Sequence, residues 1–183
     1  MPRSAPGFWR HRGVTAFALL PLSLLFALLS GVRRRLYRAG LLRVERLPVP
    51  VIVVGNIAVG GSGKTPVVAR LAQLLQAHGE RPAILSRGYA RQQNSAGVTV
   101  VSTPDAVIAS VAQSGDEPML LARSLPGVPV LVCADRFDAG LAAERQFSAT
   151  VHLLDDGFQH VALARDIDLL LAEQRMTAAA VQM

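Results

Sequence analysis

Hydrophobic positions follow two different patterns in this chain, one on each side of residue 50. The first is a run of 19 residues without a charge at 14–32, which reads VTAFALLPLSLLFALLSGV. As a helix it would measure about 28 Å, close to the roughly 30 Å hydrocarbon core of a bilayer. Pro21 lies inside the run, and membrane helices tolerate proline better than soluble helices do. We therefore predict an N-terminal transmembrane helix over about 14–32.

Two other interpretations of this run stay open. A cleaved signal peptide would export the rest of the chain, but the three arginines at 33–35 directly after the run oppose translocation. A helix buried in a soluble core, or lying in the plane of the membrane, is the second alternative. The run shows no wide polar face, which favours crossing or deep insertion.

After residue 50, short aliphatic runs alternate with stretches of helical periodicity. Near-continuous aliphatic strands between helices predict an α/β layered domain with a mainly parallel sheet. Pro48 and Pro50 indicate a linker at 43–50, so we divide the chain into an anchor with a basic juxtamembrane segment (1–47) and one α/β domain (48–183). The predicted strands are 51–55, 83–86, 98–102, 130–134, 151–154 and 168–171, and the predicted helices are 66–78, 105–113, 117–125 and 137–146.

The net charge of +6 is distributed unevenly along the chain. Residues 1–50 carry nine arginines and one acid, a net of +8, whereas residues 51–183 carry ten basic and twelve acidic groups, a net of −2. A basic region beside an apolar run favours anionic lipid headgroups over nucleic acid as its partner. The rest of the chain shows no basic stripe with interleaved aromatic residues, which is the pattern expected of a nucleic-acid-binding surface. Six arginines follow the run and three precede it, so the positive-inside rule predicts a single-pass protein with a cytoplasmic domain.

A glycine-rich segment directly follows the strand predicted at 51–55. It reads Ala58-Val59-Gly60-Gly61-Ser62-Gly63-Lys64-Thr65 and leads into a predicted helix, the order that a P-loop requires. The glycines let backbone N–H groups wrap around phosphate oxygens at a helix N-terminus. Lys64 would reach the β- and γ-phosphates of a nucleoside triphosphate, and the Thr65 hydroxyl would coordinate Mg²⁺. Lys64 is the only lysine of the chain, and the other eighteen basic residues are arginines. Its position in the P-loop needs a slender point charge, which arginine would not replace.

Two acidic segments are candidates for chemistry. Asp155 and Asp156 end the apolar strand predicted at 151–154, the place where a Walker-B aspartate of a P-loop protein meets Mg²⁺. Asp116 and Glu117 precede a predicted helix, where helix capping alone also explains acids. Arg87 and Tyr89 after the second strand, and His160 after the Asp155–Asp156 pair, are weaker candidates.

The single cysteine, Cys133, forms no internal disulfide and indicates a reducing compartment.

Together these motifs resemble the tetraacyldisaccharide 4′-kinases of lipid A biosynthesis. The matching residues are Gly55-Asn56 through GGSGKTP, SRGY at 86–89, GDEP at 115–118 and LDDGFQH at 154–160. The resemblance implies ATP-dependent phosphorylation of the 4′-hydroxyl of a tetraacyldisaccharide 1-phosphate, a lipid A precursor, at the cytoplasmic face of the inner membrane. It implies Asp116 as base, Glu117 with Thr65 as the Mg²⁺ shell, and Asp155 and Asp156 on the Walker-B side, with Lys64 on the phosphates. It further implies Arg87, Tyr89 and His160 as substrate contacts.

The resembled family continues beyond this length with a second domain that supplies further catalytic residues. The tail 173–183, EQRMTAAAVQM, does not continue the family pattern, so we expect a truncated or frame-shifted product and an incomplete site. A membrane-associated regulatory or partitioning ATPase is the alternative function, although such proteins often carry an extra lysine before the glycines, where Val59 stands here. A nucleotide-binding module without kinase activity is a third. The sequence indicates no obligate protein partner.

Overall fold

The computed structural model describes residues 14–56, 63–88, 91 and 97–171. The side chains of 14–19 and of Arg38 also lie outside the described set. The chain divides into two compact units, Met1–Arg43 and Val44–Met183, slightly before the boundary predicted at 47/48. Each unit is described by itself.

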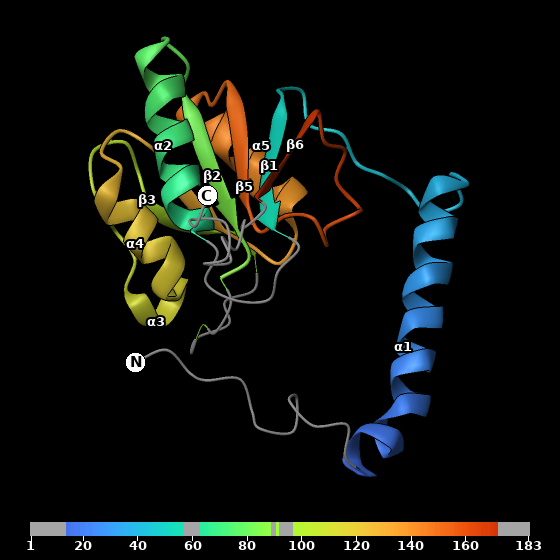
Figure 1. Ribbon diagram of the computed structural model, residues 1–183. Helices are drawn as coiled ribbons and strands as arrows, with labels where there is room; N and C mark the ends of the chain where they lie inside the picture. The colour runs from blue at the N-terminus through green and yellow to red at the C-terminus, as the bar shows by residue number, and fades with distance from the viewer. Residues whose placement is uncertain (1–13, 57–62, 89–90, 92–96, 172–183) are drawn as a thin grey trace, which may run out of the picture. The chain divides into compact units, whose positions relative to one another are not determined.

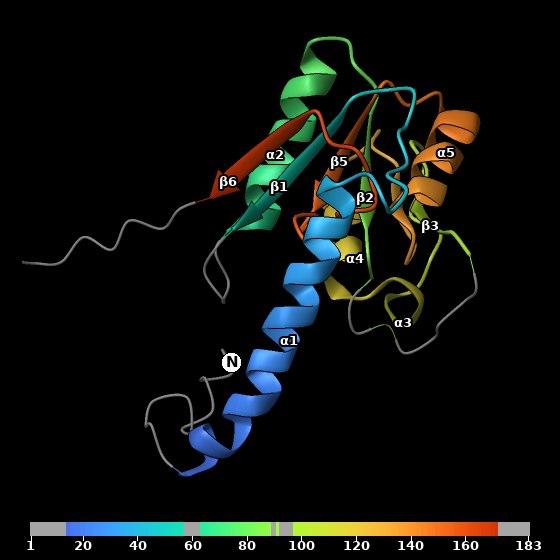
Figure 2. The same cartoon turned by 90° about the vertical axis from the view of Figure 1, so that its right-hand side faces the viewer.

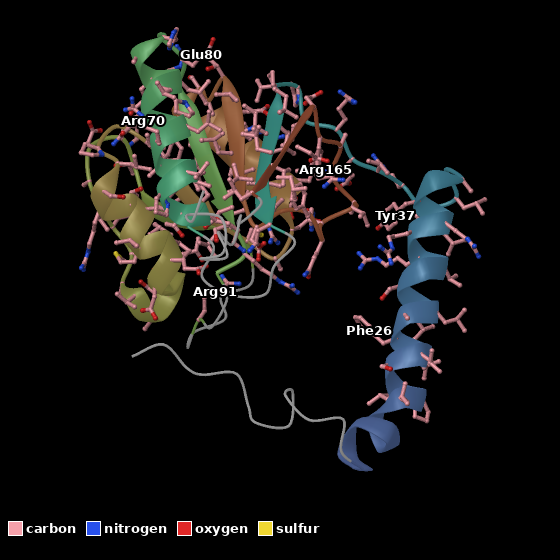
Figure 3. The ribbon with its side chains drawn as sticks, in the orientation of Figure 1. Phe26, Tyr37, Arg70, Glu80, Arg91 and Arg165 are labelled. Atoms are coloured by element: carbon pink, nitrogen blue, oxygen red, sulfur yellow. The ribbon has the colours of Figure 1, made fainter. Side chains whose placement is uncertain are left out.

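The first unit contains one helix, α1 (Val14–Arg38), among its described residues. The helix continues through Pro21 and past the predicted apolar run into the arginines, and the guanidinium of Arg33 lies 5.7 Å from the ring centroid of Tyr37. Apolar side chains are exposed along it, with Phe26 73% accessible (Figure 3). Within the part of the chain that the structure describes, no helix is both long and apolar enough to cross a membrane. The predicted transmembrane span is therefore not confirmed.

A six-stranded sheet forms the centre of the second unit, in the order β3-β4-β2-β5-β1-β6 (Figures 1 and 2). Every neighbouring pair is parallel except β3 with β4, which confirms the mainly parallel sheet predicted from the aliphatic runs. The strands are β1 (Val51–Asn56), β2 (Pro82–Ser86), β3 (Thr99–Ser102), β4 (Val130–Val132), β5 (Val151–Asp155) and β6 (Ile167–Leu171), all within two residues of the predicted ranges.

Helices cover both faces of the sheet because both faces of its central strands are apolar. In β1, Ile52 and Val54 pack into one core together with residues of α2 (Lys64–Ala77) and α4 (Asp116–Ser124). Val51 and Val53 point the other way, into a second core with Ala139 and Ala143 of α5 (Arg136–Phe147). The alternation of side chains along a strand thus produces three layers, with α5 opposite α2 and α4 (Figure 2).

One predicted helix is wrong over most of its length. Only α3 (Val111–Ser114) is helical within the predicted range 105–113. Before it, the Thr103 hydroxyl accepts the backbone N–H groups of Asp105 and Ala106, and Ile108 donates its N–H to the Val101 carbonyl. The Thr103 side chain thus offers the backbone a turn in place of a helix. The Ser110 capping box with Gln113 then begins α3.

The second unit begins at Val44, before the first strand of the sheet. Glu45 exchanges two backbone hydrogen bonds of 2.8 Å, donating to Ala162 and accepting from Ala164. Leu47 is buried against Gly140 of α5, where a side chain on residue 140 would collide with the Leu47 methyl groups. The part of the predicted 43–50 linker that follows Arg43 therefore packs on the α/β domain.

Candidate functional site

The candidate residues gather at the carboxyl edge of the sheet. Strands β4, β2, β5 and β1 are neighbours in that order and run parallel, so their C-terminal ends lie along one edge. Chemistry-bearing residues follow each of these ends, and this is the edge where open α/β sheets bind their ligands. In the order of the strands they are Asp135 and Arg136, then Arg87, then Asp155 to His160, then the P-loop.

Part of the predicted P-loop is described. Ala58, Val59, Gly60, Gly61, Ser62 and the substrate candidate Tyr89 lie outside the described residues, whereas Gly63, Lys64 and Thr65 are inside. Gly63 caps α2 with φ 69°, a left-handed conformation that glycine adopts at little cost. Lys64 and Thr65 begin the helix, and its first turn holds no acidic residue. The N-terminus of α2 therefore offers a positive potential to an anion.

Lys64 connects this helix to the acidic segment after β5. Its Nζ lies 2.8 Å from Oδ1 of Asp156, whose backbone N–H donates to the Val54 carbonyl at 3.0 Å. Asp156 has φ 57°, a left-handed conformation that aspartate adopts more readily than most residues. The Lys64 side chain is 20% accessible and that of Asp156 is 60% accessible. The pair is therefore accessible to solvent at the carboxyl edge of the sheet and does not lie inside the core.

Asp155, the last residue of β5, is buried beside these charges. Burial, and then the charge of Glu117, raises the pKa of the Asp155 carboxyl to about 6, whereas the charge of Lys64 opposes the shift. Asp155 pairs in register with Val54 of β1, which explains its position next to the phosphate loop. Sequence reasoning placed the Asp155–Asp156 pair on the Mg²⁺ side of the P-loop. The structure adds the direct contact of Asp156 with Lys64 and the action of the Lys64 charge on Asp155.

Asp116 and Glu117 form the first turn of α4. The helix begins after Gly115, which has φ 89°, and both acids are exposed. Because the charge of Glu117 acts on Asp155, this end of α4 lies toward the site. The structure describes no direct contact from Asp116 to Lys64 or to the Asp155–Asp156 pair, so the assignment of Asp116 as base stays a prediction.

The carboxyl group of Asp155 and its neighbours also suit a divalent cation. The described residues contain no group of three or more histidine, cysteine or acidic side chains arranged to hold a metal. Mg²⁺ in phosphate-transfer sites needs fewer protein ligands than such a group supplies, because one or two carboxylates share the ion with phosphate oxygens and water. Burial, and then the charges of Glu117 and Asp156, raise the pKa of the Asp155 carboxyl, and a bound cation would stabilise its charged form, so the donor set fits Mg²⁺.

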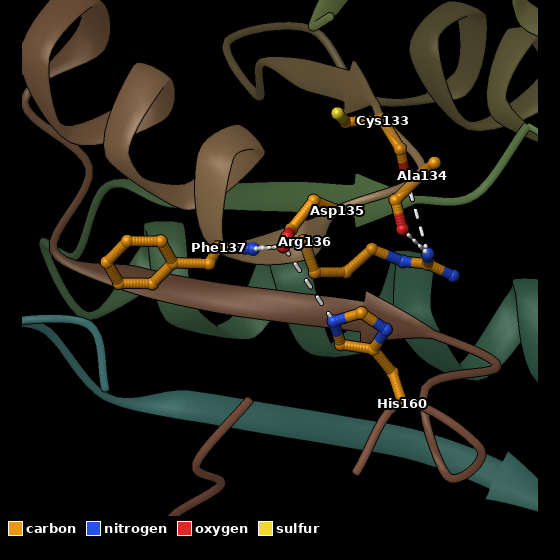
Figure 4. A network of polar contacts seen from close by, with 6 residues as sticks. All are labelled: Cys133, Ala134, Asp135, Arg136, Phe137 and His160. Carbon is orange, nitrogen blue, oxygen red and sulfur yellow. Dashed lines mark hydrogen bonds and ion pairs between the residues drawn. The ribbon is translucent and has the colours of Figure 1, made fainter. Parts of the chain in front are cut away.

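Two residues that sequence reasoning missed lie at the end of β4. Arg136 is only 4% exposed, and its Nη1 donates to the carbonyls of Ala134 at 2.8 Å and Cys133 at 3.4 Å (Figure 4). Burial, and then the charge of Arg87, lowers the pKa of the Arg136 guanidinium. Asp135 approaches His160, with 4.0 Å between Oδ1 and Nε2. Their position directly after the aliphatic strand predicted at 130–134, like that of Arg87 after the strand predicted at 83–86, was the signal that could have found them.

Phe158 explains why glycine stands at position 55. A Cβ atom built on Gly55 would overlap the Phe158 ring, so this ring packs directly on the backbone at the end of β1. The Arg165 guanidinium covers the same ring, 5.9 Å from its centroid. The acidic segment is thereby held against the strand that leads into the P-loop.

Comparison with known proteins agrees with this arrangement. The family model described as "LpxK: Tetraacyldisaccharide-1-P 4'-kinase" matches residues 15–181. A tetraacyldisaccharide 4'-kinase of Azoarcus sp. (strain BH72) is 53% identical over 171 residues, which are 93% of this chain and 48% of that protein. The corresponding protein of Acidovorax ebreus (strain TPSY) is 51% identical over 164 residues, 89% of this chain and 46% of that protein.

A solved structure is also similar. It is a crystal structure of the "apo" form of LpxK from Aquifex aeolicus in complex with ATP, with a TM-score of 0.77 and 47% sequence identity. The match covers 84% of this chain and 47% of that chain, so our chain spans about half the length of the relatives it matches. On the extent of the family match and these identities, the chain belongs to the tetraacyldisaccharide-1-P 4'-kinase family.

Proposed function

We propose that this chain provides the ATP-binding part of a kinase that phosphorylates the 4′-hydroxyl of a tetraacyldisaccharide 1-phosphate in lipid A biosynthesis. The observation that carries the proposal is the contact of Lys64, at the start of the phosphate-binding helix, with Asp156 after the neighbouring strand. Phosphoryl transfer depends on positioning and charge neutralisation more than on covalent chemistry by the protein. Family membership and an ATP-bound relative supply the substrate class.

The chain's own residues divide this work between them. Lys64 and the N–H groups at the start of α2 hold the phosphates, and Lys64 neutralises charge that builds up there. Mg²⁺, when bound, would be held by the Thr65 hydroxyl with carboxylates of Glu117 and the Asp155–Asp156 pair, and it supplies charge neutralisation. Asp116 accepts the proton of the sugar hydroxyl as general base.

The acceptor lies, in this proposal, on the β4 and β2 side of the edge. Arg87, Tyr89 and His160 are its proposed contacts, and the buried Arg136 adds positive charge beside Arg87. Two guanidinium groups close together suit the negative charge of a phosphorylated sugar.

We also propose that α1 binds the inner membrane, with the α/β domain on the cytoplasmic side. Exposed apolar side chains along α1, followed by Arg33, Arg34 and Arg35, suit a surface of anionic lipid. Flotation with vesicles of neutral and of anionic lipids tests this proposal. Binding that needs neither α1 nor anionic lipid would contradict it.

The kinase assay uses the full chain, labelled ATP and a tetraacyldisaccharide 1-phosphate in mixed micelles. Transfer of label to the lipid, lost in Lys64→Ala, is the expected result. Release of inorganic phosphate at the same rate without the lipid would instead favour a membrane-associated ATPase. Nucleotide binding without either product would favour a binding module.

A further inference from the structure

The carboxylate of Asp135 faces the imidazole of His160 (Figure 4). Asp135 follows β4 and His160 follows β5, two strands that are separated in the sheet by β2. Oδ1 of Asp135 lies 4.0 Å from Nε2 of His160, and their side chains are 52% and 20% accessible. The contact joins two loops of the candidate site that are 25 residues apart in the sequence.

Asp135 is held in place from both sides. The same Oδ1 accepts the backbone N–H of Phe137 at 2.9 Å, which makes Asp135 the N-cap of α5. On the other side, the buried Arg136 guanidinium donates to the carbonyls of Cys133 and Ala134, the two residues before Asp135. A carboxylate fixed in this way loses little further freedom when a histidine packs against it.

His160 is held through its backbone as well. Its backbone N–H donates to the Gly157 carbonyl at 3.0 Å, which closes a turn after the Asp155–Asp156 pair. The turn fixes the position from which the imidazole extends toward Asp135. A carboxylate beside one ring nitrogen favours the proton on that nitrogen and so selects both the ring orientation and the tautomer.

We propose that Asp135 is a positioning residue that orients the His160 imidazole toward the acceptor. The inference rests on the proposed function, in which His160 contacts the sugar substrate. A partly exposed polar contact contributes little to stability, so the effect of Asp135 on His160 is expected on the geometry of the site rather than on the fold. A simple N-cap would have the opposite signature, a change in stability with no effect on His160.

Substitution of Asp135 by serine separates its role as the N-cap of α5 from its role in orienting the His160 ring. Asp135→Ser keeps a good N-cap but cannot reach the ring, whereas Asp135→Asn keeps the cap and the length without the charge. Asp138→Ser is the matched control, because Asp138 is an exposed acid in the first turn of the same helix. Imidazole ¹⁵N chemical shifts of the full chain report the His160 tautomer, with the buried His152, which contacts Glu144 at 3.0 Å, as internal reference.

Asp135→Ser is expected to alter the ¹⁵N signature of His160 and to lower kcat/KM roughly tenfold with an unchanged melting temperature. Asp138→Ser should change neither quantity. In a His160→Gln background, Asp135→Ser should add almost nothing to the loss. An unaltered His160 signature in folded Asp135→Ser and Asp135→Asn, or equal losses of kcat/KM in both backgrounds, would overturn the proposal. If the wild-type chain transfers no phosphate, the proposed function fails, and the ¹⁵N signature alone still decides whether Asp135 orients the ring.

Discussion

Lys64, the first residue of α2, and Asp156, in the loop after β5, form an ion pair of 2.8 Å although they are 92 residues apart in the sequence. The pair forms because β1 and β5 are parallel neighbours, so the loops after them start side by side. Lys64 thus has a carboxylate partner at the position where the proposed phosphate would lie. ATP and Asp156 are expected to compete for the same ammonium group, with Mg²⁺ able to take over the carboxylate.

Removal of the Lys64 charge should weaken nucleotide binding. Lys64→Ala deletes a charge-assisted phosphate contact and leaves Asp156 without its partner. We expect a loss of about 1.5–3 kcal/mol in the binding free energy of Mg·ATP, or roughly 10- to 150-fold in Kd. Calorimetric titration of the full chain measures it, with Asp138→Ala as a charge control. Unchanged affinity in Lys64→Ala would refute the P-loop assignment.

Asp155 should make stability depend on pH. Its folded-state pKa of about 6 lies above the ordinary 3.8, so the folded protein binds this proton more tightly than the unfolded chain does. The free energy of unfolding of the wild type should therefore fall relative to that of Asp155→Asn as the pH rises from about 4 to 6. Above pH 6 the gap between the two free energies should stay constant, after a total change of up to about 3 kcal/mol. Urea unfolding at several pH values measures the gap. A gap that grows as the pH falls would contradict the burial of this carboxyl.

Substitution of Gly55 should disturb the site through Phe158. Gly55→Ala places a methyl group where the ring lies, and we expect a loss of about 1–3 kcal/mol in the free energy of unfolding. Phe158→Leu in the Gly55→Ala background should restore part of this loss, because the smaller side chain leaves room. Thermal unfolding of both single variants and the double variant measures the coupling. Strictly additive losses would mean that the two residues do not oppose each other.

Asp116 should affect turnover and not ATP binding. A general base acts only as the hydroxyl proton leaves, so Asp116→Asn is expected to lower kcat about 10²- to 10⁴-fold with an unchanged Kd for ATP. Steady-state assays with the lipid acceptor, together with ATP titration, separate the two quantities. Asn keeps the size of the side chain, and the melting temperature shows whether α4 is intact. Wild-type kcat in this variant would reduce Asp116 to an ordinary acid at a helix start.

Local patterns in the sequence predicted most of the elements and the candidate phosphate-binding residues. Aliphatic strands, a glycine-rich turn and a following helix depend on neighbours in the chain, so the six strands were predictable, and the helix that begins at Lys64 was predicted from residue 66 onward. The same locality explains the error at 105–110, where the Thr103 hydroxyl competes with helix formation at a distance of two to three residues.

Only the tertiary structure decided which strand ends meet. The order of parallel strands in a sheet is set by the packing of both faces, which no single segment encodes. That order brings Asp156 to Lys64, Phe158 to Gly55 and Asp135 to His160, and it turns Asp155 into a buried acid with a raised pKa. The sequence by itself thus identified the family's motifs, whereas their interactions follow from strand order, since a side chain's charge and burial depend on neighbours that are distant in the chain.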